Sequence, residues 1–314
     1  MNTIKLPGGV LLSEIALGES GLSGGRPEES IYPVLDRYVD LGGFTFDTAR
    51  LYGRCDAALG RWIKSRGFSD KAAVITKGSH PNLETMFVSR LSKAEIEGDL
   101  ETSLRELQLE CSALHILHRD DVRIPVEEIM PVLDSLVKAG KTRAIGVSNW
   151  TAARIIKANT FATENGLTPL VCTQAHYSLA QTTAHAMTDI THVPMNDVEL
   201  NWYRSEPFPL IAFGSQARGW FVKRSKDEEP TELPRLYYDA FPENWRRLER
   251  LRNLSAQIGR SLSAITTAYV RDSLPIAIPL CSYSSLEQLE ESMDALNFKL
   301  TKEQIRYLET GEDD

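Results

Sequence analysis

Cysteine is scarce in this 314-residue chain, and the chain has no long apolar run. The four cysteines, Cys55, Cys111, Cys172 and Cys281, form no C-x-x-C pair, which argues against a zinc site or a disulfide framework. We expect them to be small buried hydrophobic side chains. No stretch approaches the roughly 18 apolar residues of a membrane span, and no basic segment followed by an apolar run opens the chain. We therefore expect a cytoplasmic protein that does not enter a membrane and holds no metal ion.

Positively charged residues are fewer than negatively charged ones. Lys and Arg number 35 against 43 Asp and Glu, so the formal net charge is −8 and the pI is near 5.4. Neutralising nucleic-acid phosphates requires clustered Lys and Arg, and this chain shows no such cluster. We therefore expect no nucleic-acid partner. Nothing in the sequence indicates an oligomeric state.

The chain does contain a regular alternation of apolar runs and amphipathic segments. Eight short runs typical of buried strands begin at Ser13, Phe44, Ala72, Ala113, Ala144, Leu170, Pro209 and Pro275. Helical periodicity fills several intervals, namely 29–43, 57–67, 92–109, 126–141 and 244–261. Strands that are apolar on both faces and alternate with helices indicate a parallel sheet covered by helices. Eight such repeats favour an α/β fold, a closed (β/α)8 TIM barrel, as a single domain over residues 1–314.

Short signals mark several helix ends and two long connections. Ser92 with Glu95 fits a capping box, and Thr301 with Gln304 fits another before a final helix. The connection 179–207 contains one helical pattern, near residues 196–203, and the insert 216–244 looks irregular. Loops of this length are usually functional, and both would leave the carboxyl ends of strands, where barrel active sites lie.

Four reactive side chains stand at or just after the carboxyl ends of neighbouring predicted strands. Asp47 ends the second strand with Tyr52 in the loop behind it, Lys77 ends the third and His118 the fourth. A tyrosine pKa near 10 hinders proton donation at neutral pH, but a nearby ammonium stabilises the phenolate and lowers that pKa. Lys77 could supply this charge and Asp47 could hold it in place. With His118 donating a hydrogen bond to a carbonyl oxygen, the four residues predict a site that gives a proton to a carbonyl group.

Each of these residues taken alone has an ordinary structural explanation. A strand-end Asp often caps a helix, a Lys usually faces solvent, and a His in an apolar strand is more often a core residue than a catalyst. Their common place at the ends of adjacent strands favours the catalytic interpretation. Moreover, four motifs in this order, FDTARLYG, VITKGS, LHILHRD and IGVSNW, resemble the signature of the aldo-keto reductase superfamily along nearly the whole chain.

This resemblance implies a barrel enzyme that binds NADP(H) or NAD(H) without a Rossmann domain. It implies the catalytic tetrad Asp47, Tyr52, Lys77 and His118. It assigns the nicotinamide carboxamide to Ser148, Asn149 and Gln174, and the face of the ring to Phe213. It places the loop after the seventh strand against the pyrophosphate, with the residues Gly214, Ser215, Gln216, Ala217 and Arg218. The glycine-rich segment from Gly18 is interpreted as an entry loop near the cofactor.

The segment after the eighth strand departs from the family pattern. The cofactor-binding positions expected there are Ser282, Ser284, Gln288, Glu291 and Ser292. The three serines replace a usual Gly, a basic residue and an Asn, and residues 272–298 contain no Lys or Arg. A 2′-phosphate without a cationic partner loses charge-assisted hydrogen bonds, so the customary preference for NADP is in doubt. Arg218 could compensate, and the alternative is that it is a solvated surface arginine.

The leading functional hypothesis is an NAD(P)-dependent oxidoreductase that interconverts a carbonyl compound, such as an aldehyde, ketone or sugar, and an alcohol. One alternative is a sugar-modifying enzyme that retains NAD(H) through a cycle of oxidation and re-reduction. Another is a nicotinamide-sensing subunit with slow turnover. A metal-dependent barrel enzyme is disfavoured, because the strand ends lack a convincing set of His and carboxylate ligands.

The substrate itself cannot be identified from the sequence. Candidate walls of the substrate pocket are His80, Trp150, Tyr177, Trp202, Trp220 and Phe221. Aromatic side chains of this kind stack on a sugar face or on an aromatic aldehyde, and they also form ordinary cores. The polar neighbours His80 and His176 favour a hydroxylated substrate.

Overall fold

The computed structural model describes residues 1–18, 27–187, 189 and 191–312. Eight parallel strands close into a barrel in the order β10-β3-β4-β5-β6-β7-β8-β9, and a two-stranded sheet precedes them. Each of the eight predicted runs contains one barrel strand, so the predicted α/β barrel is confirmed. The chain divides into two compact units, residues 1–174 and 175–314, which are described separately below. The single domain over 1–314 stays a prediction, and the glycine-rich segment after Gly18 lies outside the described residues.

The strands of the first unit are short and buried. Their bounds are β1 Thr3–Lys5, β2 Leu11–Ser13, β3 Ala16–Gly18, β4 Thr45–Asp47, β5 Ala73–Gly78, β6 Leu114–Leu117, β7 Ile145–Ser148 and β8 Thr173–His176, whose last two residues belong to the second unit. Every residue of β4 to β8 is buried, as expected for parallel strands covered on both faces. The β1–β2 hairpin was not predicted. Its strands of three residues are too short to show an alternating pattern, and its turn uses Gly8 and Gly9 at φ +78° and +89°.

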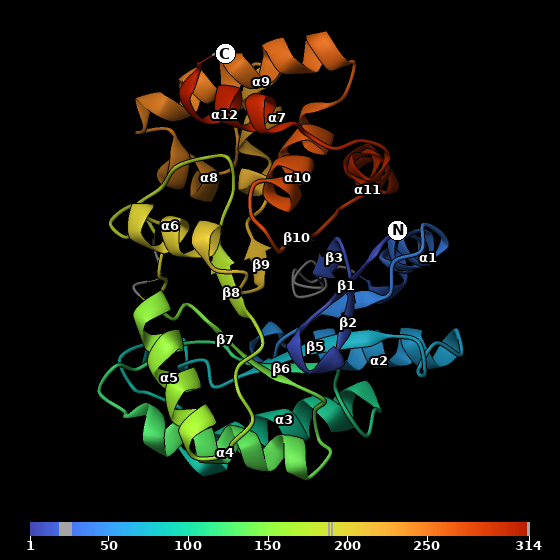
Figure 1. Ribbon diagram of the computed structural model, residues 1–314. Helices are drawn as coiled ribbons and strands as arrows, with labels where there is room; N and C mark the ends of the chain where they lie inside the picture. The colour runs from blue at the N-terminus through green and yellow to red at the C-terminus, as the bar shows by residue number, and fades with distance from the viewer. Residues whose placement is uncertain (19–26, 188, 190, 313–314) are drawn as a thin grey trace. The chain divides into compact units, whose positions relative to one another are not determined.

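In the described part of the first unit, five α-helices and three 3₁₀-helices accompany the strands, and the α-helices are labelled in Figure 1. These helices are η1 Pro7–Gly9, η3 Glu28–Ser30, α1 Tyr32–Asp40, η4 Arg50–Tyr52, α2 Cys55–Ser65, α3 Lys93–Leu107, α4 Val126–Lys138 and α5 Ala152–Glu164. The predicted capping box at Ser92 is confirmed, because its side chain accepts from Glu95 N while the Glu95 carboxylate accepts from Ser92 N. Helix α3 packs on β5 and α4 on β7, which fixes the strand ends that carry the candidate site.

The second unit holds two further strands and mostly helices. The elements are α6 Asp197–Ser205, β9 Leu210–Phe213, η5 Ala217–Gly219, α7 Trp220–Ser225, α8 Glu232–Tyr238, α9 Pro242–Ile258, α10 Leu262–Asp272, β10 Ala277–Cys281, α11 Leu286–Met293, η6 Asp294–Asn297 and α12 Lys302–Thr310. Helix α6 is the only one in the described part of 179–207, as predicted, and the Thr301 capping box is present. The prediction that 216–244 is irregular is wrong, because it contains α7 and α8. Their short lengths, with Pro230 between them and Pro234 inside α8, hid the helical period.

Two other sequence expectations concern burial and membranes. Cys55, Cys172 and Cys281 are buried as predicted, whereas Cys111 is partly exposed. Among the helices of the described residues, none combines the length and apolarity that a membrane crossing requires.

Candidate active site

A buried ion pair lies at the centre of the candidate site in the first unit. The Lys77 Nζ on β5 donates a short hydrogen bond to Asp47 Oδ1 at the end of β4. The other carboxylate oxygen, Oδ2, accepts from Gln174 Nε2 at 2.8 Å. The Lys77 side chain is fully buried and that of Asp47 nearly so. Burial by itself would lower the pKa of Lys77, but the charge of Asp47 and the neighbouring Tyr52 outweigh it and raise that pKa above its usual value.

Tyr52 lies directly over this ammonium. It ends η4, the 3₁₀ turn that follows β4, and the Lys77 Nζ is 5.0 Å from the centroid of its ring. Burial raises the pKa of Tyr52, whereas the positive charge of Lys77 lowers it in part. The net direction is upward, so the simple expectation of a lowered tyrosine pKa needs correction for desolvation. A raised pKa keeps the phenol protonated at neutral pH, which a proton donor requires.

His118 completes the group from the end of β6. Its backbone N–H donates to Gly78 O at 2.8 Å, which joins the ends of β5 and β6. Its ring centroid is 5.8 Å from that of Tyr52 at an interplanar angle of 82°. The structure therefore brings all four predicted catalytic side chains together, each next to another member of the set.

The three residues predicted to bind a carboxamide adjoin this group at the ends of β7 and β8. Asn149 Nδ2 donates to Ser148 Oγ at 2.9 Å and more weakly to His118 O at 3.5 Å. Asn149 has φ +60° and its backbone N–H donates to Gln174 O at 3.1 Å. All three are buried and carry amide or hydroxyl groups, which match the donors and acceptors of a carboxamide. One amide hydrogen of Gln174 is already used by Asp47.

The sequence reasoning overlooked several polar residues that support this group. Asp56 on α2 is buried and accepts from Thr48 Oγ1 and Ser103 Oγ, both at 2.6 Å. Burial raises the pKa of Asp56. The bond to Thr48 closes the loop that contains Tyr52. An isolated acid on an otherwise apolar helix face was the available signal, since such an acid is buried only with partners.

Arg119 was also overlooked, although it directly follows His118. It is 6% exposed, its Nη1 donates to His118 O at 2.7 Å, and its charge partly offsets the burial that raises the pKa of Tyr52. Among the described residues, no group of three or more His, Cys, Asp or Glu side chains could hold a metal ion.

The second unit holds the predicted pyrophosphate loop and adenosine-end residues. Ser215 Oγ donates to Leu280 O at 2.9 Å, and Gln216 Nε2 donates to Ser292 Oγ at 2.8 Å. Arg218, at φ +52°, lies with its guanidinium 5.4 Å from the Tyr237 ring centroid. These contacts give the loop 214–218 a defined conformation.

The remaining predicted positions differ in exposure. Ser282, Ser284 and Gln288 are exposed, Glu291 is partly exposed and Ser292 is buried. Gln288 Oε1 accepts from Ser284 N at 2.8 Å. Gly214 has φ +68°, which disfavours any residue with a side chain. An added Cβ would also lie only 2.8 Å from His176 Nε2, so it would clash with the His176 ring. Phe213 ends β9 and lies 5.5 Å from His176 between ring centroids.

The predicted walls of the substrate pocket fall into two groups. His80 is buried with its ring centroid 4.8 Å from that of His118, so it adjoins the tetrad. Trp150 is buried beneath the guanidinium of Arg154, 4.6 Å from its ring. In the second unit, Tyr177 donates to Tyr269 and Trp220 to Asp239.

The second group, Trp220, Phe221 and Trp202, packs mainly against other aromatic rings. Trp220 and Phe221 are completely or almost completely buried, and their ring centroids are 5.1 Å apart. Trp202 packs on Tyr203 at 4.7 Å and on Phe208 at 5.4 Å. Their burial favours a core role over a wall role for Trp220 and Phe221, whereas Trp202 is partly exposed.

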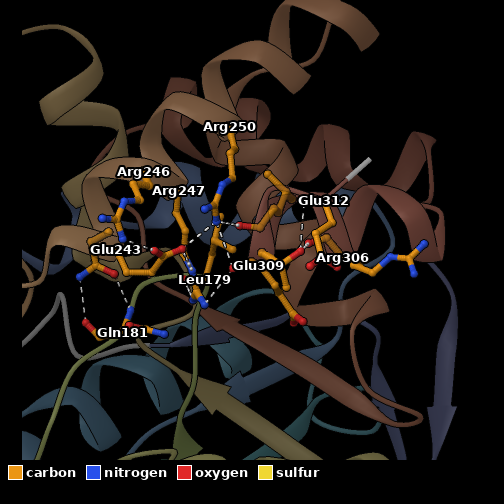
Figure 2. A network of polar contacts seen from close by, with 12 residues as sticks. Leu179, Gln181, Glu243, Arg246, Arg247, Arg250, Arg306, Glu309 and Glu312 are labelled. Carbon is orange, nitrogen blue, oxygen red and sulfur yellow. Dashed lines mark hydrogen bonds and ion pairs between the residues drawn. The ribbon is translucent and has the colours of Figure 1, made fainter. Parts of the chain in front are cut away.

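A polar network ties the C-terminal helices of the second unit to the loop after β8 (Figure 2). Arg247 Nη1 donates to Leu179 O at 2.6 Å, and Arg250 Nη1 donates to Glu243 Oε1 at 2.7 Å and Glu309 O at 3.0 Å. The Glu309 carboxylate accepts from Arg204 at 2.6 Å. These bonds anchor both ends of the long connection, and none of the groups involved was predicted to be catalytic.

The family model described as "Aldo/keto reductase family" matches residues 14–312. The chain belongs to this family. This aldo-keto reductase is 30% identical to norsolorinic acid reductase A of Aspergillus parasiticus over 325 residues, which cover 97% of this chain and 79% of that protein. It is 28% identical to putative aryl-alcohol dehydrogenase AAD14 of Saccharomyces cerevisiae, over 96% of this chain and 82% of that protein.

The fold of this aldo-keto reductase also matches a solved structure. The thermostable aldo-keto reductase Tm1743 superposes with a TM-score of 0.75 at 20% identity, over 99% of each chain. The chain is thus an enzyme of a family of oxidoreductases that use nicotinamide cofactors, with small-molecule carbonyl compounds as substrates. The predicted resemblance is confirmed. The roles of individual residues stay predictions.

Proposed function

We propose that this enzyme interconverts a carbonyl compound and an alcohol by hydride transfer, with NADP(H) or NAD(H) as cofactor and Tyr52 as proton donor. The observation that supports this is the continuous set of contacts from Asp47 through Lys77 and Tyr52 to His118. Three neighbouring strand ends provide these groups, and no single one would support the proposal alone.

The protein groups have distinct roles in this reaction. Tyr52 gives its hydroxyl proton to the carbonyl oxygen as negative charge develops there. The Lys77 ammonium, held by Asp47, stabilises the phenolate that remains. His118 donates a hydrogen bond to the same oxygen and orients it. The raised pKa of Tyr52 supports proton donation, because the free enzyme then carries the proton before substrate binds.

The residues present fit a nicotinamide cofactor. Ser148, Asn149 and Gln174 offer a hydroxyl and two amides beside the tetrad, which suits recognition of the carboxamide. When bound, the nicotinamide supplies or accepts the hydride. Phe213 would stack on the ring, and the loop 214–218 would hold the pyrophosphate.

Two alternatives, another kind of enzyme and a binding subunit, are distinguished by the same test. A sugar-modifying enzyme would retain NAD(H) in a cycle of oxidation and re-reduction, and a nicotinamide-sensing subunit would bind cofactor but turn over slowly. The names of the relatives, norsolorinic acid reductase A and putative aryl-alcohol dehydrogenase AAD14, make aromatic carbonyl compounds and alcohols the first substrates to try.

The test is a titration with NADPH and NADH by fluorescence quenching, followed by a panel of carbonyl compounds with the preferred cofactor. We expect saturable binding and reduction of at least one aldehyde. Nucleotide released on denaturing the purified protein would favour the retained-cofactor alternative. Tight cofactor binding without turnover of any carbonyl compound would favour the sensing subunit and contradict the proposal.

A further inference from the structure

An arginine at the start of α5 contacts both the loop after β6 and the loop after β7. The Arg154 Nε lies 2.8 Å from Asp120 Oδ2 and 3.0 Å from Oδ1. Its Nη2 donates to the backbone oxygens of Asp121 and Ile124, at 3.2 and 2.7 Å. The guanidinium carbon lies 4.6 Å from the centroid of the Trp150 ring. We call Asp120, Arg154 and Trp150 the arginine clamp.

The arginine clamp lies just beyond the point where the pairing of β6 with β7 ends. The last paired residues are Leu117 and Val147, so His118 and Asn149 lie outside this ladder. A bond from Asn149 Nδ2 to His118 O connects the two residues directly, but at 3.5 Å it is at the limit of hydrogen-bond length. The clamp adds a second connection, because its aspartate is two residues after His118 and its tryptophan directly follows Asn149.

The ion pair of the clamp is largely shielded from water. The Arg154 and Asp120 side chains are both 11% exposed. Burial raises the pKa of Asp120 to about 6, against the charge and hydrogen bond of Arg154, so the carboxyl group is ionised at neutral pH. Charged groups on the same loop and on α4 and α5 form pairs of their own, Asp121 with Arg123 and Glu127 with Lys157. A planar guanidinium can bind a carboxylate, donate to carbonyl groups and stack on an aromatic ring at the same time, which an ammonium cannot do.

We propose that Arg154 is a positioning residue, which fixes the ends of β6 and β7 relative to each other and so holds His118 in place beside the residues expected to bind the nicotinamide carboxamide. This inference rests on the function proposed above and adds a residue to its machinery. Hydride transfer requires a fixed separation between the carbonyl group at His118 and the nicotinamide near Asn149, and an error of about 1 Å can lower a rate about 100-fold. Arg154 acts on this separation through Asp120 and Trp150.

The experiment compares Arg154→Met and Arg154→Lys with the wild type, and uses Lys157→Met as a matched control. Lys157 lies about one turn further along α5, and its ion pair with Glu127 joins α5 to α4 at 3.1 Å, with side chains 57% and 42% exposed. Dissociation constants are measured for the preferred reduced cofactor and for the matching fragment without nicotinamide, ADP-ribose or 2′-phospho-ADP-ribose. Turnover of an aldehyde gives kcat, and urea unfolding gives the stability of each variant.

We expect Arg154→Met to weaken binding of the reduced cofactor about tenfold and to lower kcat about tenfold or more. Affinity for the fragment should stay nearly unchanged, because the residues expected to bind it belong to the second unit. Arg154→Lys keeps a charge beside Asp120 but loses the planar fork, so it should restore part of each loss. Should Arg154→Met fail to fold in the urea assay, Arg154→Lys carries the same comparison. Lys157→Met should match the wild type in both affinities and in kcat.

Equal losses for the cofactor and the fragment, unchanged cofactor binding in Arg154→Met, or the same pattern in Lys157→Met would overturn the inference. If the wild type reduces no carbonyl compound yet Arg154→Met selectively weakens the ligand that contains nicotinamide, the proposed function fails and the role of Arg154 stands. Carbonyl reduction by the wild type, with unaltered cofactor binding in Arg154→Met, gives the reverse.

Discussion

In the first unit the central ion pair, Lys77 with Asp47, is buried at the ends of two strands and contacts a tyrosine, whereas in the second unit several ion pairs are partly exposed and join separate segments. The pair of Arg204 and Glu309, for example, has side chains 38% and 18% exposed. Removing charges from water is costly, so a buried pair is poor evidence of a contribution to stability. Partly exposed ion pairs that link distant segments hold those segments together. The tests below ask whether the buried pair of the first unit serves chemistry and the partly exposed pair of the second unit serves stability.

The largest expected effect tests this contrast with two tyrosines. Tyr52→Phe should lower turnover about 10²–10⁴-fold, because the proton donor is lost, and should leave cofactor affinity within a few-fold. Tyr269→Phe in the second unit removes a hydrogen bond of 2.7 Å to Glu309. It should lower the free energy of unfolding by about 1 kcal/mol with turnover retained. Steady-state kinetics, cofactor titration and urea unfolding measure these changes. Near-normal turnover in Tyr52→Phe would remove the assignment.

A second test acts on the buried pair. Lys77→Met leaves Asp47 buried without its ammonium, which should cost about 3–5 kcal/mol of stability or protonate the carboxyl group. Because Lys77 lowers the pKa of Tyr52 against the effect of burial, its removal should raise that pKa further. Reduction requires protonated Tyr52, so the alkaline limb of the pH–rate profile should move upward.

The matched substitution in the second unit is Arg204→Met, whose partner Glu309 keeps its bond from Tyr269. It should destabilise less and leave the pH–rate profile unchanged. An unmoved alkaline limb in Lys77→Met would show that Lys77 does not control Tyr52.

The sequence predicted the barrel and the proximity of the tetrad well, because both depend on local pattern. Apolar runs define strands, and side chains at the carboxyl ends of adjacent parallel strands must lie close together. The pairing of Lys77 with Asp47 therefore followed from their positions. The direction of the Tyr52 pKa did not, since the balance between burial and an adjacent charge depends on how deeply the loop is enclosed.

Other features depended on contacts between distant residues and could not be predicted. The hydrogen bond from Gln174 Nε2 to Asp47 Oδ2 joins residues that are 127 positions apart in the sequence. The bond from Arg90 to Asp99 is local, yet nothing in the sequence shows that a surface-type arginine fixes the loop beside His118. Helices α7 and α8 were missed because they have only 6 and 7 residues. Two turns or fewer are too short to show an amphipathic period.

The third test asks whether a positive charge in the second unit recognises the 2′-phosphate of NADPH. With no Lys or Arg in residues 272–298, NADH should bind about as well as NADPH, or better. Ser284 is exposed, and Ser284→Arg should raise affinity for NADPH about tenfold, or 1.4 kcal/mol, with little change for NADH. Dissociation constants at two salt concentrations check this, because a charge-based preference weakens as salt rises.

Arg218→Ala serves as the control for the alternative source of charge. A wild-type preference for NADPH of a hundredfold that Arg218→Ala leaves intact would contradict this account of the segment. Loss of that preference in Arg218→Ala would instead assign the 2′-phosphate to the loop after β9.

The smallest expected effect concerns one buried histidine in each unit. Burial lowers the pKa of His115 to about 4, against the opposing charge of Asp99, and lowers that of His176 to about 3, with help from Arg218. Each folded pKa lies below the unfolded value of 6.5, so the unfolded chain binds more protons as pH falls. Each histidine should therefore cost about 1 kcal/mol of stability between pH 7 and 5.5. His115→Phe and His176→Phe should each remove that part of the pH dependence in urea unfolding, to the same extent. A slope that changes in only one variant would show that the two units do not enclose their histidines alike.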